Sequence, residues 1–277
     1  MKFKHKMWVV SLVCVLVSFA VPGAQAQYQT VPASGTQCDT SLLSGCGGDG
    51  GVCAFTGTFT GNVTVSAGQN CVFNGGGVTG DVRNNGGYLE FDSSTVTGDV
   101  KQNGGELSLS STTVTENVQI TGVSTVSIFF STVGGDLQIK NDGSAPGPRR
   151  VHCIHLKRGG SEVCGTTVDG NLQFQNNSNM IDFIGNGVGG NLQVSNNSAD
   201  TDMENNGVNG NLEVWNNTAD TFVDGNTVNG NLQDHNNTGA DPADVENNTV
   251  NKNLECHNNF PGTTNMNNTV SGNTQCN

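Results

Sequence analysis

Basic residues are scarce in this chain, and their scarcity argues against two classes of partner. The 277 residues include 11 Lys and Arg against 24 Asp and Glu, a formal net charge of −13. Four of the eight basic residues after position 26 lie close together, between Arg149 and Arg158. A strongly acidic body repels polyanions, so nucleic acid and anionic lipid are disfavoured partners. Divalent cations are accommodated more easily.

Long apolar runs are lacking after the first 26 residues. The chain opens with three Lys among its first six residues, followed by an apolar run over 7–21 and by Ala24-Gln25-Ala26. This is the order of a secretory signal peptide with an A-x-A cleavage site, so 1–26 is predicted to be removed. The run is short for a membrane span and no second one follows. We therefore predict an exported protein, extracellular or periplasmic, with no membrane span.

Familiar catalytic motifs are missing too. The sequence has no G-x-S-x-G elbow, no H-E-x-x-H, no Walker loop and no dinucleotide fingerprint after a strand. Its acidic residues fall at turns of a repeat, whereas a glycoside hydrolase needs paired carboxylates at a defined separation. We lean toward a protein that is not an enzyme. If it is one, a polysaccharide lyase or glycoside hydrolase is the alternative.

What the chain has in abundance is one short pattern, apolar-x-Gly-Asx-apolar. Its fifth positions lie 18–22 residues apart, apart from one interval of 35: Val63, Val82, Val100, Val118, Leu137, Leu172, Leu192, Leu212, Leu232, Leu254 and Thr274. Such a period predicts a solenoid with one coil per repeat. We predict an all-β fold, a single elongated parallel β-solenoid of about eleven coils over 57–277, right-handed by the crossover rule. A cap over 27–56 precedes it, and an insertion at about 146–160 fills the long interval.

Eight cysteines remain after the signal peptide, an even number for an oxidising compartment. Stacked strands lie about 4.8 Å apart, a separation that a disulfide tolerates. The one-coil spacing therefore predicts two bonds, Cys53–Cys71 and Cys256–Cys276. The remaining cysteines are assigned to Cys38–Cys46, which would hold the N-terminal cap, and to Cys153–Cys164, which would close the insertion.

Three features of the repeat bear on how a coil is held. Gly at the third position is expected at a corner with positive φ. Asp234 stands in a column that is otherwise apolar and inward, so we expect it to bend out to solvent. Two columns are Asn throughout the late coils, and stacked amides predict hydrogen-bonded ladders: Asn176, Asn196, Asn216, Asn236 and Asn258, with Asn177, Asn197, Asn217, Asn237 and Asn259.

The candidate site lies on two outward columns of the late coils. One column holds Trp215, His235 and His257, and its neighbour holds Glu213, Gln233 and Glu255. Imidazoles one coil apart beside carboxylates can hold a divalent metal ion, so the predicted ligands are His235, His257, Glu213 and Glu255. Trp215, His235 and Gln233 would equally suit the face of a sugar. The alternative is a set of unrelated surface residues. No other cofactor is predicted.

The Val-x-Gly-Asn-Leu coils, with a signal peptide and a terminal Gly272-Asn273-x-x-Cys276, resemble a group of secreted bacterial β-solenoid proteins of unassigned function. The number of residues per coil is similar to that in bactofilins, which are β-helical proteins that polymerise end to end. The resemblance covers about 57–277 and implies the fold, although a secreted chain with disulfides departs from the bactofilin pattern.

Three functions remain open at this stage. The first is an exported structural or surface-binding solenoid in adhesion, matrix or envelope, with a second copy or a surface polysaccharide as partner. The second is a carbohydrate-active or carbohydrate-binding β-helix. The third is ice binding, for which the sequence shows only a short Thr row: Thr60, Thr79, Thr97 and Thr115.

Overall fold

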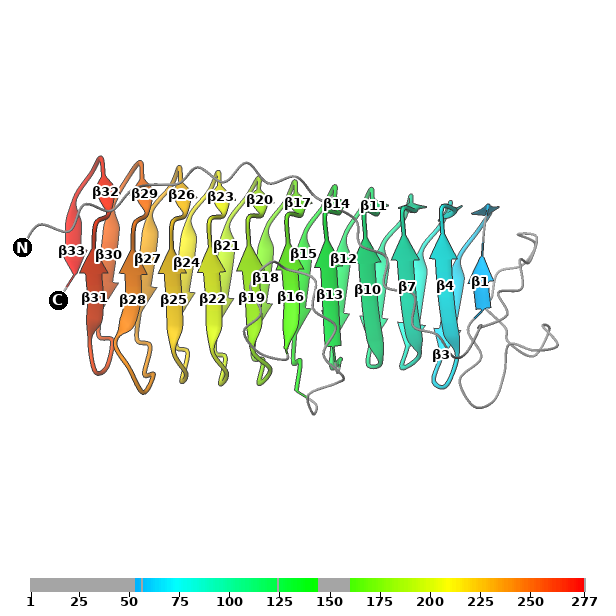
Figure 1. The fold of residues 1–277 in the computed structure, drawn as a ribbon, viewed down its shortest axis with the longest axis horizontal. Helices are drawn as coiled ribbons and strands as arrows, with labels where there is room; N and C mark the ends of the chain where they lie inside the picture. Colours follow the sequence, from blue (N-terminus) through cyan, green and yellow to red (C-terminus); the bar gives the residue numbers. More distant parts are fainter. Residues whose placement is uncertain (1–52, 56, 124, 144–159, 277) are drawn as a thin grey trace, which may run out of the picture.

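The computed structural model describes residues 53–55, 57–123, 125–143 and 160–276. These residues form 33 short strands and no helix, wound into one parallel β-solenoid (Figure 1). The predicted all-β parallel β-solenoid is confirmed. None of the described segments is a helix with the length and apolar character needed to cross a membrane. The predicted signal peptide, the body of the N-terminal cap and nearly all of the 146–160 insertion lie outside the described residues.

Each coil contributes one strand to each of three parallel sheets, here called A, B and C, and every sheet has eleven strands. Sheet A contains β1 (Cys53–Phe55), β4 (Asn70–Asn74), β7 (Tyr88–Asp92), β10 (Glu106–Ser110), β13 (Thr125–Phe129), β16 (Ser161–Cys164), β19 (Ile181–Ile184), β22 (Thr201–Glu204), β25 (Thr221–Asp224), β28 (Ala243–Glu246) and β31 (Thr263–Met266). Sheet C contains β2 (Thr58–Phe59), β5 (Gly77–Val78), β8 (Thr95–Val96), β11 (Thr113–Val114), β14 (Thr132–Val133), β17 (Thr167–Val168), β20 (Gly187–Val188), β23 (Gly207–Val208), β26 (Thr227–Val228), β29 (Thr249–Val250) and β32 (Thr269–Val270). Sheet B contains β3 (Val63–Ser66), β6 (Val82–Asn85), β9 (Val100–Asn103), β12 (Val118–Thr121), β15 (Leu137–Lys140), β18 (Leu172–Gln175), β21 (Leu192–Ser195), β24 (Leu212–Trp215), β27 (Leu232–His235), β30 (Leu254–His257) and β33 (Thr274–Cys276).

The core is one continuous apolar cluster that runs from Phe59 to Cys256. Side chains alternate inward and outward along each strand, so the first and fifth residues of the repeat point inward from sheets C and B. Sheet A supplies the third inward face, where Phe73 and Phe91 stack with ring centroids 4.5 Å apart. The predicted three-sided coil is therefore present, and each apolar residue stacks on the residue at the same repeat position in the next coil.

Two buried Asn ladders run along corners of the late coils. In the first, Asn197 Oδ1 accepts the backbone N–H of Asn177 (2.9 Å) and its Nδ2–H (3.1 Å), and the motif repeats along the predicted column. The second ladder was not predicted and follows sheet A: Asn186, Asn206, Asn226, Asn248 and Asn268. Buried backbone N–H groups are thus paired from coil to coil.

The other predicted Asn column has a different role. Asn176 and Asn196 have φ of 58° and 57°, in the left-handed region, and Asn216 has the same conformation. These side chains are exposed and their mutual hydrogen bonds are long, 3.4 Å between Asn216 Nδ2 and Asn196 Oδ1. Asn is favoured at this corner because it tolerates positive φ better than most residues.

The expectation of positive φ at the third-position Gly is wrong for every repeat except the one with Gly61. Gly is needed there because the coils approach closely. A Cβ on Gly210 would clash with Asn191 Oδ1 and lie 2.6 Å from Gly190 O. Where Lys252 replaces Gly, the coils separate: its N–H to Gly230 O distance is 3.3 Å, against 2.8 Å between Gly210 N and Gly190 O.

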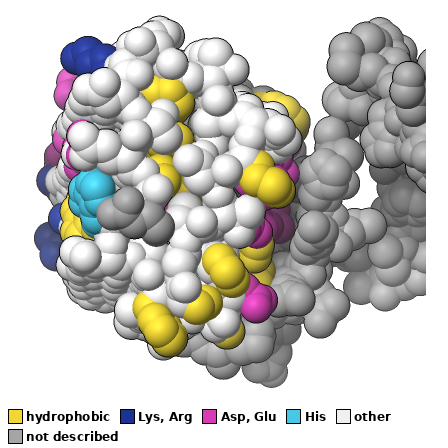
Figure 2. All heavy atoms as spheres, turned by 90° about the vertical axis from the view of Figure 1, so that its left-hand side faces the viewer, with side chains coloured by type: hydrophobic (Ala, Val, Ile, Leu, Met, Phe, Trp, Pro, Cys, Tyr) yellow, Lys and Arg dark blue, Asp and Glu magenta, His cyan; other side chains and the backbone are white. Residues whose placement is uncertain are grey.

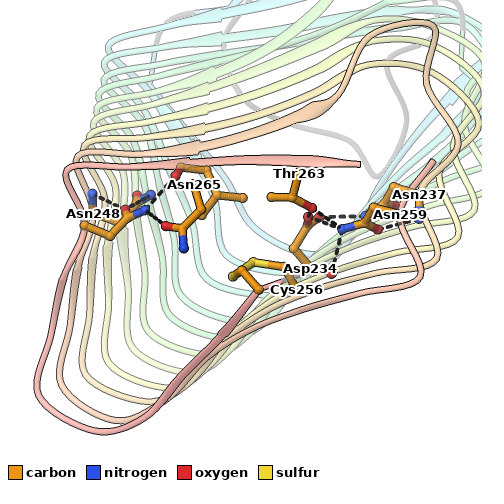
Figure 3. The surroundings of a disulfide bond; sticks show 10 residues. Asp234, Asn237, Asn248, Cys256, Asn259, Thr263 and Asn265 are labelled. Carbon is orange, nitrogen blue, oxygen red and sulfur yellow. Dashed lines mark hydrogen bonds between the residues drawn. A yellow bond between two sulfur atoms is a disulfide. The ribbon is translucent and has the colours of Figure 1, made fainter. Parts of the chain in front are cut away.

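The Cys256–Cys276 disulfide is present and joins β30 to β33, near the C-terminal end (Figure 3). Cys71 is also disulfide-bonded, and Cys53 is its register neighbour in β1. Cys164 is disulfide-bonded as well. The other predicted cysteines (Cys38, Cys46 and Cys153) lie outside the described residues, so the remaining pairings and the disulfide-held cap stay predictions.

Asp234 does not bend out to solvent, contrary to expectation. It is fully buried, next to Cys256 in register, and its carboxylate accepts hydrogen bonds from Asn237 Nδ2 (2.6 Å) and Asn259 Nδ2 (2.5 Å), with Thr263 close by (Figure 3). Burial raises the pKa of Asp234 to about 7, although the bonds from Asn237, Thr263 and Asn259 act in the opposite direction. The first Asn ladder supplies the donors that allow a carboxylate to stay inside.

Candidate functional site

The candidate site lies on the outward face of sheet B, over its late coils. His235 ends β27 and His257 ends β30, and the two residues are register partners on neighbouring strands. Leu232 and Asp234 point inward, so strand alternation directs Gln233 and His235 outward. The side chains of His235, His257 and Glu255 are each half-buried. The repeat therefore fixes their spacing without further loops.

Three of the four predicted metal ligands come together. The rings of His235 and His257 lie 5.2 Å apart between centroids, tilted by 48°. One ligand atom from each of His235, Glu255 and His257 lies within 4.8 Å of the other two. Glu213 does not join them because its carboxylate accepts hydrogen bonds from Gln193 Nε2 (2.8 Å) and Asn211 Nδ2 (3.2 Å). The prediction that Glu213 is a ligand is not supported by this arrangement.

The two His side chains differ in their surroundings. Burial lowers the pKa of His235; the charge of His257 lowers it further, and Glu255 raises it. A neutral imidazole is the form that binds metal. Nε2 of His235 is buried and has no hydrogen-bond partner among the described residues. A buried polar atom without a partner lowers the stability of the fold unless a hydrogen-bond donor, a hydrogen-bond acceptor or a metal ion binds it.

Gln233 orients the carboxylate of the site. Its Nε2 donates to Glu255 Oε2 at 3.1 Å. A polar partner of this kind limits the rotation of a ligating side chain. Gln233 is thus hydrogen-bonded to Glu255, and its contact with a sugar stays a prediction.

Trp215 stands one coil before His235, as its register partner on β24, and is half-buried. The predicted row of Trp215, His235 and His257 therefore exists. Binding of a sugar by this row stays a prediction. Glycan-array binding that is unchanged by Trp215→Ala would exclude Trp215 as the contact.

A second outward surface, on sheet C, was underestimated from the sequence. The short Thr row at Thr60, Thr79, Thr97 and Thr115 is exposed. A second column on the same face is formed by the first residues of the sheet C strands. It is Gly at positions 77, 187 and 207 and an exposed Thr at the others: Thr58, Thr95, Thr113, Thr132, Thr167, Thr227, Thr249 and Thr269. The signal was the phrase Thr-Val-Thr, in which both Thr face away from the buried Val.

Comparisons with known proteins do not assign a family. No family model matches the chain, and neither a curated protein nor a solved structure is significantly similar to it. The likeness to secreted bacterial solenoids and to bactofilins therefore rests on coil type alone, and a bacterial origin stays a prediction. Function has to be inferred from the geometry of the outward faces of sheets B and C and of the end of the solenoid.

Proposed function

We propose that this protein is an exported structural β-solenoid that associates end to end through its last described coil. The rod is suited to bearing load along its length. Its core is continuous over the stacked coils, and two buried amide ladders join successive coils in the late half. In a stack of this kind each coil contacts only its neighbours, so the terminal coils differ from the others in having one face without a neighbouring coil.

The last described coil carries the proposal. Its strands β31, β32 and β33 each stand at the edge of a sheet. Met266 is 49% exposed and Phe260 73%, while Val270 and Cys276 pack on the core but are only partly buried. Figure 2 shows hydrophobic side chains spread over this end face. Open strand edges with exposed apolar side chains favour pairing with a further coil.

The polar groups of the end indicate what kind of coil fits. In earlier coils, the backbone N–H of each ladder Asn donates to Oδ1 of the Asn one coil later. Among the described residues, the backbone amides of Asn259 and Asn268 lack that acceptor. A partner must therefore present a three-sided rung at the same spacing. A second copy of this chain offers such rungs, so we infer self-association.

Sedimentation velocity over a concentration series tests this function. The secreted form is expected to shift to larger species as its concentration rises, and electron microscopy should show elongated particles. Val270→Lys places a charge on the end face and should reduce association. Thr227→Lys, on the lateral face of β26 two coils before the last, is the matched control and should leave association unchanged. A strict monomer at high concentration would exclude the proposal.

Ice binding is a second candidate, favoured by the paired Thr columns of sheet C. Neighbouring coils repeat at about 4.8 Å and alternate residues of a strand at about 6.7 Å, so the columns form a regular array of hydroxyl and methyl groups. The array is best developed around Thr95, Thr97, Thr113 and Thr115. A thermal hysteresis assay tests it: activity that is lost in Thr97→Lys but kept in Gln119→Lys, an exposed position on sheet B, supports this function, and no activity in the native protein excludes it.

A further inference from the structure

We propose that His235, Glu255 and His257 bind one divalent transition-metal ion, and that Zn²⁺ suits the three side chains best. The site lies on the lateral face of sheet B, whereas the proposed association uses the end face. A failure of metal binding would therefore leave the proposed self-association unaffected, and the reverse also holds.

The distances between the donors are compatible with a single ion. Zn²⁺ binds imidazole nitrogen at about 2.0–2.1 Å and carboxylate oxygen at about 2.0–2.2 Å, so ligand atoms around a tetrahedral ion lie about 3.3 Å apart. The three donor atoms already lie within 4.8 Å of one another. The remaining gap has to be closed by rotation of the side chains, because the paired strands β27 and β30 fix the backbone positions.

Two observations indicate a site that is prepared for a cation. Nε2 of His235 is buried without a hydrogen-bond partner among the described residues, although it belongs to a half-buried side chain. The carboxylate of Glu255 is oriented by Gln233 and has no ion-pair partner among the described residues. A metal ion bound through Nε2 of His235 would satisfy the buried nitrogen and neutralise the carboxylate together.

The donor set selects the class of ion. Two imidazoles and one carboxylate suit Zn²⁺, Cu²⁺ or Ni²⁺, whereas Ca²⁺ and Mg²⁺ prefer six or more oxygen ligands. Three protein ligands leave the fourth position of tetrahedral zinc for water or for an external group. The ion would also link β27 to β30 across one coil boundary and stabilise that boundary by mass action.

The simpler interpretation is a row of aromatic side chains that stack along one column. That interpretation accounts for Trp215, His235 and His257, which are register neighbours. It does not account for Glu255, which lies in the neighbouring column yet has an oxygen within 4.8 Å of a nitrogen of each His. The convergence of donors from two columns favours a metal site.

Isothermal titration with Zn²⁺ tests the site on the full secreted chain. The native protein is expected to show one class of binding that His257→Gln weakens by at least about 10-fold, the smallest loss typical of even an indirect partner of a metal ligand. Glu213→Gln is the matched control, because Glu213 is an outward carboxylate one coil away that does not join the cluster. It should leave Zn²⁺ binding unchanged. Equal binding by the native protein and His257→Gln would overturn the proposal, as would equal losses in both variants.

Spectroscopy provides a second readout if His257→Gln folds poorly. Cu²⁺ bound to the native protein should give an electron paramagnetic resonance spectrum with two nitrogen ligands, and Glu255→Gln should change its axial parameters while keeping both nitrogens. Zn²⁺ should raise the thermal midpoint of the native protein but not that of Glu255→Gln. A spectrum without two nitrogens, or an equal shift by Mg²⁺ and Zn²⁺, would contradict the site.

Discussion

The coils before the 146–160 insertion and those after it build the same three-sided cross-section with different polar groups. One corner column reads Ser94, Thr112 and Ser131 early, then Thr166, and is Asn from Asn186 onward. In the early form, Thr112 Oγ1 donates to Phe91 O (3.1 Å) and to Ser110 O (2.9 Å). In the late form, Asn206 Nδ2 donates to Asn226 Oδ1 of the next coil (3.0 Å) and to Phe183 O of the preceding coil (3.0 Å).

The left-handed corner changes in the same way. It is occupied by glycines in the early coils (Gly86, Gly104 and Gly122), with φ between 65° and 98°, and by Asn from Asn141 onward. The coil length changes too, from 18–19 residues to about 20. A hydroxyl has one hydrogen to donate, which Thr112 directs to Phe91 O of the preceding coil or to its own coil. An amide has two N–H donors and an acceptor, so one side chain can bond to both neighbouring coils at once. The late half is therefore expected to be more cooperative.

The largest expected effect comes from breaking the amide ladder. Asn217 Oδ1 accepts from Asn197 N (3.0 Å) and Nδ2 (2.9 Å), and its Nδ2 donates to Asn237 Oδ1 (3.0 Å). Asn217→Ala leaves several buried groups unpaired and should lower the free energy of unfolding by about 3–4 kcal/mol. Thr112→Ala, in the early coils, should cost about 1 kcal/mol. Urea unfolding measures both, and equal costs would show that the two corners are equivalent.

An effect of similar size concerns Asp234 and pH. Its pKa is about 7 in the folded protein, against about 3.9 when unfolded, so its charged form is disfavoured by folding. Its contribution to stability is present in full below pH 4 and is lost as pH rises to 7, by up to about 4 kcal/mol. Asp234→Val matches Val214 in the same column. It should remove this part of the pH dependence and raise stability at pH 8.

Denaturant unfolding at pH 4 and pH 8 checks the Asp234 prediction. The difference between native protein and Asp234→Val should grow with pH. A constant difference would mean that the carboxylate does not titrate in this range. Asp224→Asn changes a partly exposed carboxylate and is the control for general effects of charge.

Third-position glycine gives a smaller effect. Gly210→Ala introduces a Cβ against Asn191 Oδ1 and Gly190 O. Lys252 shows that a coil can yield by a few tenths of an ångström, so we expect a loss of about 1–2 kcal/mol rather than unfolding. Gly207→Ala meets no atom within 4 Å and should change stability by less than about 0.5 kcal/mol. Thermal midpoints of the two variants compare them directly.

The smallest effect is expected for substitutions at the corner with positive φ, where early coils have Gly and late coils have Asn. Asn216 has φ of 57° and only a 3.4 Å side-chain bond to Asn196. Asn216→Gly copies the early coils and should be neutral within about 0.5 kcal/mol. Asn216→Ala also has a short side chain, but Ala is strained at positive φ. It should therefore lower the free energy of unfolding by about 1 kcal/mol. Equal stabilities of the two variants would show that φ does not determine the choice of residue here.

Much of the molecule follows from the repeat, while four details do not. The period predicted the three-sided coil, the Cys256–Cys276 bond and the pairing of His235 with His257. It did not show that Gly210 is required by a close approach, that Asp234 is buried, that Asn206 and its column form a second ladder, or that Glu213 turns away from the site. Each of these depends on which side chain reaches which neighbour across a corner.

The sequence alone determined which residues stack on which, because a solenoid adds one coil per repeat and every residue keeps its column. Only the tertiary structure decided what the stacked residues do. Corner width, the direction of each amide and the reach of a long side chain such as Glu255 depend on distances between coils in three dimensions, which a one-dimensional period does not contain.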